Sequence, residues 1–413
     1  MFLIFYIIIS ILSRVICKNE LYMGYRIYNI DLKTKEQESK LHLLKSDLID
    51  FWRKPSYKHN ITGRAIVPPS HVEWFEDKLN EINVTRDVVI QDVYEYLKER
   101  DISNDNATDG VFDFESYHRY DKILDYMKSI ERVYANSSET LIELVEAGTT
   151  DENRPLVYLR ITGKSSTPVQ KSVVVIEAAI NPREWITVPA ALNIVNKTVE
   201  ESQRRFLENL EWIVIPVLNP DGYEYTHTNV RLWTKSRSTR SNLGQICPGV
   251  NINRNFNIDW LASDSSSSPC SHIYGGIEPF SEPESRLIRR LLEEYGRNIK
   301  LYISLQNNGG FVSYPWQYER AASGMFRQHH LLGLDMIKAM GTNYTLDVGS
   351  EALGDRVSGT STDYAMDNGV LYTFNLNVEK EGSDEVIIPE SNIKPIADSI
   401  WNAVAIAAES IMN

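Results

Sequence analysis

The sequence predicts an α/β protein with a doubly wound, mixed but mostly parallel sheet, helices on both of its faces, and a small α+β domain in front of it. Short apolar runs recur along the chain, at residues 172–180, 212–217, 301–305 and 371–376. Because these runs do not alternate with polar residues, they are typical of strands buried on both faces of a sheet. Helical patterns separate them, as at residues 282–295, and this alternation favours parallel strands joined by helices. The last helix carries one buried stripe, formed by Ile396, Ile400, Val404 and Ile411.

Residues 18–100 predict the small domain. Residues 25–30 alternate apolar and polar side chains, a helical pattern carries Trp74 and Leu79, and residues 86–93 return to a strand pattern. This order of elements is typical of a split βαβ unit.

Two local patterns predict helices within this domain. Residues 41–48 could form one helix. Ser70 and Glu73 have the spacing of a capping box, in which each side chain bonds the backbone of the other residue, so we expect a second helix to begin there.

Residues 101–111 predict a linker, because the segment is polar and acidic and has almost no large apolar side chain. Lys98 and Arg100 precede it and would be open to a trypsin-like protease. The main domain is expected at residues 112–413.

The N-terminus predicts export. Residues 1–12 are almost continuously apolar, too short a run to cross a bilayer, and fit the core of a signal peptide at residues 1–17. The alternative is a buried N-terminal strand. No later segment has 18 consecutive apolar residues, so we expect a secreted, extracellular protein without a membrane span.

Cysteine usage and glycosylation signals agree with export. With Cys17 at the expected cleavage point, Cys247 and Cys270 remain, and an even pair in an exported chain predicts one disulfide. The alternative is two free buried thiols. Six asparagines begin N-glycosylation sequons: Asn60, Asn83, Asn106, Asn136, Asn196 and Asn343.

Net charge excludes one class of partner. The formal net charge is -13, and a chain this acidic would be repelled by the phosphates of nucleic acids. We therefore expect no nucleic-acid partner.

Several longer segments match the motifs of one family, in the family's order. They are Asn181-Pro-Arg-Glu-Trp-Ile, Pro216-Val-Leu-Asn-Pro-Asp-Gly-Tyr223, Arg231-Leu-Trp, Lys235-Ser-Arg-Ser and Gly249-Val-Asn-Ile-Asn-Arg-Asn-Phe256. From about residue 112 onward the chain resembles zinc carboxypeptidases of the pancreatic A/B type, and residues 18–100 resemble their activation segment. Cys247 and Cys270 lie at a spacing similar to that of the family disulfide. The resemblance implies the carboxypeptidase fold.

The resemblance also implies where a zinc site would lie, and the residues there are unusual. The family binds zinc through His, Glu and His, and this sequence has Asn181, Glu184 and Gln306 at those positions. Only Glu184 is a competent ligand, since a carboxamide oxygen is a weak neutral donor for zinc. We therefore expect no cofactor, although active members of the family use zinc.

The positions that the resemblance assigns to catalysis are also changed. The general base position holds Asn377, the position of the arginine that stabilises the oxyanion holds Thr234, and the tyrosine position aligns with Asp355. A general base contributes about 10²–10⁴ in rate, and an oxyanion donor about 10²–10³. Asn251 stands where the family has an aspartate that orients the first histidine ligand.

Some substrate-binding positions keep the family's residues. Arg183, Asn253 and Arg254 match residues that bind the substrate backbone and its terminal carboxylate. Thr362 occupies the position that sets side-chain preference, and Asp363 beside it matches a structural residue. These residues either retain recognition of peptide C-termini or now serve folding alone.

Three functions remain open from the sequence. The first is a secreted pseudoenzyme that binds peptide C-termini or protein partners without hydrolysing them. The second is an active metallocarboxypeptidase that removes C-terminal amino acids through an altered zinc site. The third is a secreted structural or storage protein. The changed positions favour the first, and on that interpretation the chain is not an enzyme.

Overall fold

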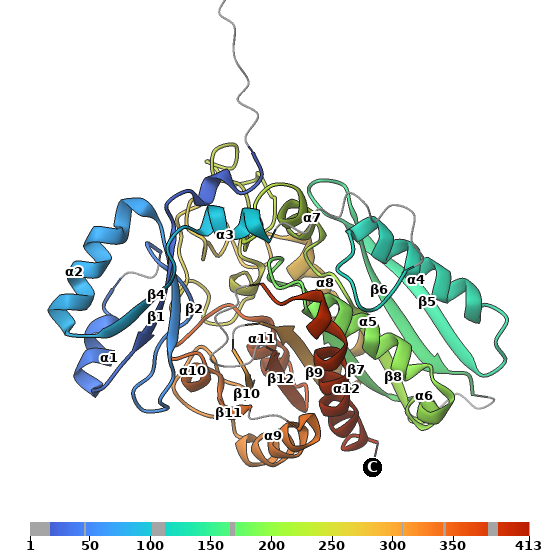
Figure 1. Cartoon of the computed structure of the whole chain (residues 1–413). Helices are drawn as coiled ribbons and strands as arrows, with labels where there is room; N and C mark the ends of the chain where they lie inside the picture. The colour runs from blue at the N-terminus through green and yellow to red at the C-terminus, as the bar shows by residue number, and fades with distance from the viewer. Residues whose placement is uncertain are drawn as a thin grey trace, which may run out of the picture.

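The computed structural model describes residues 17–44, 47–100, 112–165, 170–307, 309–341, 344–378 and 387–412. They form a small domain before residue 101 and a large domain after residue 111, which lie side by side (Figure 1). The expected signal peptide core and the expected linker at residues 101–111 lie outside the described residues. Among the described helices, none is long and apolar enough to cross a membrane.

The small domain is an antiparallel sheet covered by helices. Its sheet has the order β2-β3-β1-β4. Its elements are β1 (Arg26–Asp31), α1 (Lys35–Leu41), β2 (Asp50–Arg53), β3 (Gly63–Val67), α2 (Val72–Ile82), β4 (Thr85–Ile90) and α3 (Val93–Glu99). Tyr28, Phe75 and Leu79 are fully buried between sheet and helices.

The helix expected near Ser70 is confirmed as α2, whereas two other details of the small-domain prediction are wrong. Residues 42–44 and 47–48, part of the helix expected at residues 41–48, are not helical, and the helix in this part of the chain is α1, which ends at Leu41. The capping box lies at Thr34 and Gln37, where it opens α1. Ser70 instead lies in a 3-10 turn, Pro69–His71, and its hydroxyl bonds the ring of His71.

The large domain confirms the predicted fold class. In the described part of the chain, eight strands form one sheet of order β11-β10-β12-β9-β7-β8-β6-β5. The strands are β5 (Thr140–Thr149), β6 (Pro155–Gly163), β7 (Ser172–Glu177), β8 (Leu210–Ile215), β9 (Ile299–Gln306), β10 (Phe311–Tyr314), β11 (Thr345–Val348) and β12 (Tyr372–Asn377). The four central strands are parallel, and each corresponds to an apolar run in the sequence.

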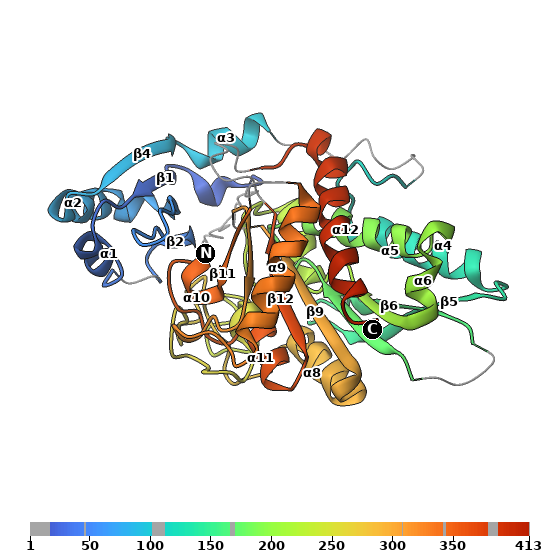
Figure 2. The same ribbon diagram turned by 90° about the horizontal axis from the view of Figure 1, so that it is seen from below.

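Helices cover both faces of this sheet, as Figure 2 shows from below. The helices of the large domain are α4 (Tyr120–Tyr134), α5 (Thr187–Thr198), α6 (Arg204–Asn209), α7 (Pro220–Thr228), α8 (Pro283–Tyr295), α9 (Phe326–Met340), α10 (Gly349–Ala352), α11 (Ser361–Asp367) and α12 (Ile393–Glu409). One core packs α4, α5, α9 and α12 against the sheet. A second core packs α8 and α11 against the opposite face. Of the predicted stripe, Ile400 and Val404 are fully buried on α12 and Ile396 is partly buried, whereas Ile411 is buried beyond the end of the helix.

The topology brings several strand ends to one edge. Because β7, β9 and β12 run parallel, their carboxyl ends meet at the same edge of the sheet. Gln306 and Asn377 are register partners there. In open α/β sheets such an edge is the usual place for a binding site.

Candidate functional site

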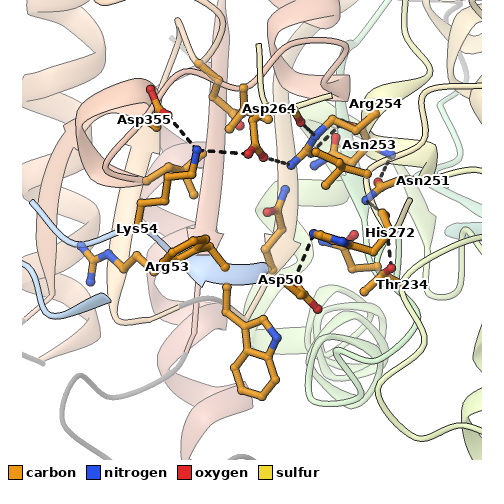
Figure 3. Close-up of a pocket in the computed structure, with 18 of the residues that line it drawn as sticks. Asp50, Arg53, Lys54, Thr234, Asn251, Asn253, Arg254, Asp264, His272 and Asp355 are labelled. Carbon is orange, nitrogen blue, oxygen red and sulfur yellow. Dashed lines mark hydrogen bonds and ion pairs between the residues drawn. The ribbon is translucent and has the colours of Figure 1, made fainter. Parts of the chain in front are cut away.

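A cleft lies at this edge, where strand β2 of the small domain meets the large domain (Figure 3). Its lining brings together eight of the residues singled out from the sequence: Asn181, Arg183, Thr234, Asn251, Asn253, Arg254, Gln306 and Asp355. It also contains residues that the sequence did not single out, among them Asp50, Lys54, Asp264, His272 and Gln317. Glu184, Thr362 and Asn377 are buried and do not line it.

Strand β2 enters the cleft with an acidic residue at its start. Asp50 Oδ2 lies 2.5 Å from Arg183 Nη1, and Asp50 Oδ1 lies 3.7 Å from His272 Nε2. Burial alone would raise the pKa of Asp50, but Arg183 and His272 hold it below its ordinary value. Burial lowers the pKa of His272, so its ring is neutral near pH 7. The Asp50–Arg183 pair therefore provides the charge interaction at this end of the cleft.

A lysine just beyond β2 makes the second contact. Lys54 Nζ lies 2.7 Å from Asp355 Oδ2 and 3.2 Å from Asp264 Oδ1. Burial would lower the pKa of Lys54, yet the two carboxylates raise it, so the ammonium stays charged. The main chain adds a bond, because the backbone N–H of Lys54 donates to the carbonyl of Leu353 at 3.2 Å.

The three positions expected for zinc hold a hydrogen-bonded set of side chains. Asn181 Nδ2 donates to Glu184 Oε1 at 3.1 Å, and the backbone N–H of Asn307 donates to Glu184 Oε2 at 3.0 Å. Gln306 Nε2 donates to Asn375 Oδ1 at 3.0 Å. Both oxygens of the one carboxylate thus accept N–H groups.

This donor set does not fit zinc. Zinc sites use imidazole nitrogen, thiolate or carboxylate ligands, and catalytic sites keep three of them. Here two of the three candidates are carboxamides, which are weak donors for zinc. Across the described residues, no group of three or more His, Cys, Asp or Glu side chains is arranged to hold a metal ion.

The expected catalytic positions are occupied by neutral or paired groups. Asn377 is 1% exposed, and its Oδ1 has no hydrogen-bond partner among the described residues. Thr234 Oγ1 donates to the carbonyl of His272 at 3.4 Å. Asn251 Nδ2 donates to the same carbonyl at 3.2 Å. Asp355 is paired with Lys54. The other three side chains are neutral, so none of the four is poised to take a proton from water.

Arg254, the expected carboxylate anchor, already holds a carboxylate of this chain. Its Nη2 lies 2.8 Å from Asp264 Oδ2, and its Nε donates to the backbone carbonyl of Asp264 at 2.7 Å. Asn253 Oδ1 accepts the backbone N–H of Ser361 at 3.1 Å. Asn253 and Arg254 therefore bond other groups of the large domain, and their role in binding stays a prediction.

The expected specificity position is covered. Thr362 is fully buried, and its Oγ1 accepts a hydrogen bond from Gln317 Nε2 at 2.7 Å and one from Asn375 Nδ2 at 3.1 Å. Asp363 accepts the backbone N–H groups of Gln317 and Tyr318, and its burial raises its pKa to about 7. Side chains of the protein therefore occupy the space above Thr362.

The disulfide closes a loop that contributes several residues to this site. Cys247 and Cys270 are joined, with their Cα atoms 4.9 Å apart. The closed loop contains Asn251, Asn253 and Arg254, together with Asp264.

The sequons differ in accessibility. Asn60, Asn83 and Asn136 are exposed, whereas Asn196 is half-buried within α5. Asn106 and Asn343 lie outside the described residues. Glycosylation at each site stays a prediction.

Comparison with known proteins follows the two-domain division. The model of the zinc carboxypeptidase family matches residues 123–403, and that of the carboxypeptidase activation peptide matches residues 28–100. Carboxypeptidase B of Helicoverpa zea is 30% identical over 98% of this chain and 97% of its own length. Carboxypeptidase A2 of Mus musculus is 28% identical over 96% of this chain and 95% of its own length. The crystal structure of carboxypeptidase A from Helicoverpa armigera superposes with a TM-score of 0.86 at 26% identity, covering 95% of this chain and 98% of that one.

Proposed function

The chain belongs to the zinc carboxypeptidase family, and we propose that it is a secreted pseudoenzyme of that family, which binds polypeptide in its cleft without hydrolysing it. One observation carries the proposal. Asn181, Gln306 and Asn377, at three positions where the family's chemistry needs imidazole or carboxylate, are all carboxamides. A carboxamide neither holds zinc well nor accepts a proton at physiological pH.

The surroundings of these carboxamides support the proposal. Gln306 and Asn181 donate hydrogen bonds to Asn375 and Glu184, so their amide groups serve a network within the protein. Removing a buried polar partner from such a network costs stability. The substituted residues are therefore integrated into the fold.

The missing oxyanion donor supports it further. Thr234 carries a hydroxyl where a guanidinium would stabilise developing negative charge, and that hydroxyl bonds a backbone carbonyl. The losses of metal, base and oxyanion donor act on the same step, so their effects combine to remove nearly all of the catalysis.

Retained residues support a binding role for the cleft. Arg183 and Arg254 still face it, and β2 of the chain itself already lies there in extended form. On that basis we assign polypeptide as the class of ligand that this chain binds, and we place the chain outside the cell.

The experiment is zinc analysis of the purified secreted protein after dialysis, with an active zinc carboxypeptidase treated in parallel. We expect a zinc-to-protein ratio near zero, and no zinc-dependent release of C-terminal amino acids after the activation segment is cut away. A ratio near one together with such release would overturn the proposal, because a replacement site would then exist.

A further inference from the structure

We propose that the cleft is a receptor for a lysine side chain on an extended internal segment of polypeptide, with Asp264 and Asp355 as the groups that bind the ammonium. Residues 50–54 of this chain are its first occupant. The inference rests on the proposed function, because it deepens the binding role given to the same cleft.

The ammonium site is built and filled. Lys54 Nζ lies within 3.2 Å of both Asp264 and Asp355, and only 11% of the lysine side chain is exposed. Two carboxylates of the large domain thus converge on one cation supplied by the small domain (Figure 3). Arg254 balances Asp264 on its other side. Asp355 has only one further cationic neighbour among its described ion pairs, Arg320, which is half exposed and 3.4 Å away.

The large domain also binds the residues next to the ammonium through its main-chain carbonyls. The N–H of Lys54 donates to the carbonyl of Leu353, and Arg53 Nε donates to the carbonyl of Ala352 at 3.0 Å. Gly354 has a φ of +79°, and a Cβ added there would lie 2.3 Å from the carbonyl oxygen of Lys54. The large domain therefore leaves room for a main chain to pass at this point, which a side chain at position 354 would block.

These contacts favour an internal segment over a C-terminus. Nε and Nη2 of Arg254 bond Asp264, and its Nη1 donates to the carbonyl of Asn253 at 3.0 Å. A terminal carboxylate that reached Arg254 would lie against the carboxylate of Asp264 and be repelled. The chain that now occupies the cleft also continues on both sides, from β2 into Pro55 and beyond.

A second contact gives the ligand its direction. Arg183 forms an ion pair with Asp50, an acidic residue four positions before the lysine. In an extended chain four residues span about 13 Å. We therefore expect ligands with an acidic residue about four positions before a lysine to bind best.

The test uses the whole protein with a specific protease site inserted between Asn104 and Asp105, cut so that both pieces are present. The probe is a fluorescent peptide of residues 47–56, blocked at both ends, and its binding is followed by anisotropy. A matched peptide carries norleucine in place of Lys54, and a third ends at Lys54 with a free carboxylate.

We expect the norleucine peptide to bind about 30-fold more weakly, as is typical when one partner of a buried charge pair is removed. Asp355→Asn should reduce that difference, because only Asp264 then remains to bind the ammonium, whereas Asp367→Asn, a change at an exposed carboxylate, should keep it. Equal affinity of the lysine and norleucine peptides would overturn the inference. So would tighter binding of the peptide with the free carboxylate than of the blocked one.

If the cut pieces stay together and no peptide enters the cleft, a measurement on the intact chain tests the inference instead. Lys54→Met should speed hydrogen exchange of the β2 amides, whereas Lys40→Met on exposed α1 should not. Unchanged exchange in Lys54→Met would overturn the inference. Zinc binding or peptide hydrolysis would instead overturn only the proposed function, since the lysine preference does not depend on chemistry.

Discussion

Gln317 Nε2 lies 2.7 Å from Thr362 Oγ1, so a side chain of the protein caps the residue that was expected to form a pocket floor. Asn375 bonds the same hydroxyl, and Gln306 bonds Asn375. A buried chain of amide and hydroxyl groups therefore runs from an expected zinc position to the expected specificity position. Such networks stabilise when complete and are costly when one member is lost.

Removing this cap should destabilise the protein. Gln317→Ala takes away one of the two side chains that bond the hydroxyl of Thr362 and opens a buried space, so we expect a loss of about 1–3 kcal/mol in the free energy of unfolding. Urea denaturation measures it. Gln328→Ala, at an exposed position of α9, should change stability by less than about 0.5 kcal/mol. Equal effects of the two substitutions would contradict the proposed network.

Restoring imidazole should restore zinc binding. With Asn181→His and Gln306→His together, Glu184 would complete a set of three ligands of the kind that holds catalytic zinc. We expect about one zinc per protein by elemental analysis after dialysis. The control pair Asn181→Gln and Gln306→Asn keeps carboxamides at both positions and should bind none. If the histidine variant is well folded and also binds none, the assignment of these positions is wrong.

Docking of β2 should weaken in acid. Arg183 and His272 hold the pKa of Asp50 below its ordinary value, and Lys54 and Arg254 do the same for Asp264. A depressed carboxyl pKa contributes stability that is complete above the unfolded value, about 3.9, and is lost as pH falls through the folded value. The advantage of the wild type over Asp50→Asn in unfolding free energy should therefore be constant near pH 6–7 and narrow below about pH 4. An advantage that fails to narrow below about pH 4 would contradict this assignment.

Blocking the main-chain passage at Gly354 should also loosen β2. A side chain there meets the carbonyl of Lys54 and strains a left-handed backbone, which alone costs about 1–2 kcal/mol. Hydrogen exchange at residues 50–54 should rise in Gly354→Ala. Gly324→Ala is the matched control, because an added Cβ there has no atom within 4 Å and no left-handed φ to strain. Unchanged exchange in Gly354→Ala would show that β2 does not need this approach.

The large sheet could be predicted from the sequence because its signal is local. The runs at residues 172–180 and 301–305 are continuously apolar, and the structure buries them as β7 and β9. Helix α1 was missed because its sequence, KEQESKL, is almost entirely polar and buries only Gln37 and Leu41. The capping box at Thr34 and Gln37 is a local signal for this helix, whereas Ser70, with the same spacing to Glu73, lies where Pro69 begins a 3-10 turn.

The cleft was predicted in part, and the missing part is non-local. Motifs in the large domain pointed to Arg183 and Arg254. Nothing in the sequence joins Lys54 to Asp355, which are 301 positions apart. A single aspartate before a run of serines, such as Asp264, carries no pattern of its own. Packing of the two domains creates these pairs.

The cleft has two zones that respond differently to acid, a floor with carboxamide side chains and a rim with paired carboxylates. Asn181 and Gln306, which line the floor of the cleft, have no proton to gain or lose at any pH at which proteins fold. The floor of the cleft therefore keeps one hydrogen-bonding pattern, whereas the rim, where Asp50 and Asp355 meet their cations, changes charge below about pH 4. Acid would release a bound segment by breaking the ion pairs at the rim, while the hydrogen bonds of the floor stay the same. The site would then be ready to bind again once the pH rises.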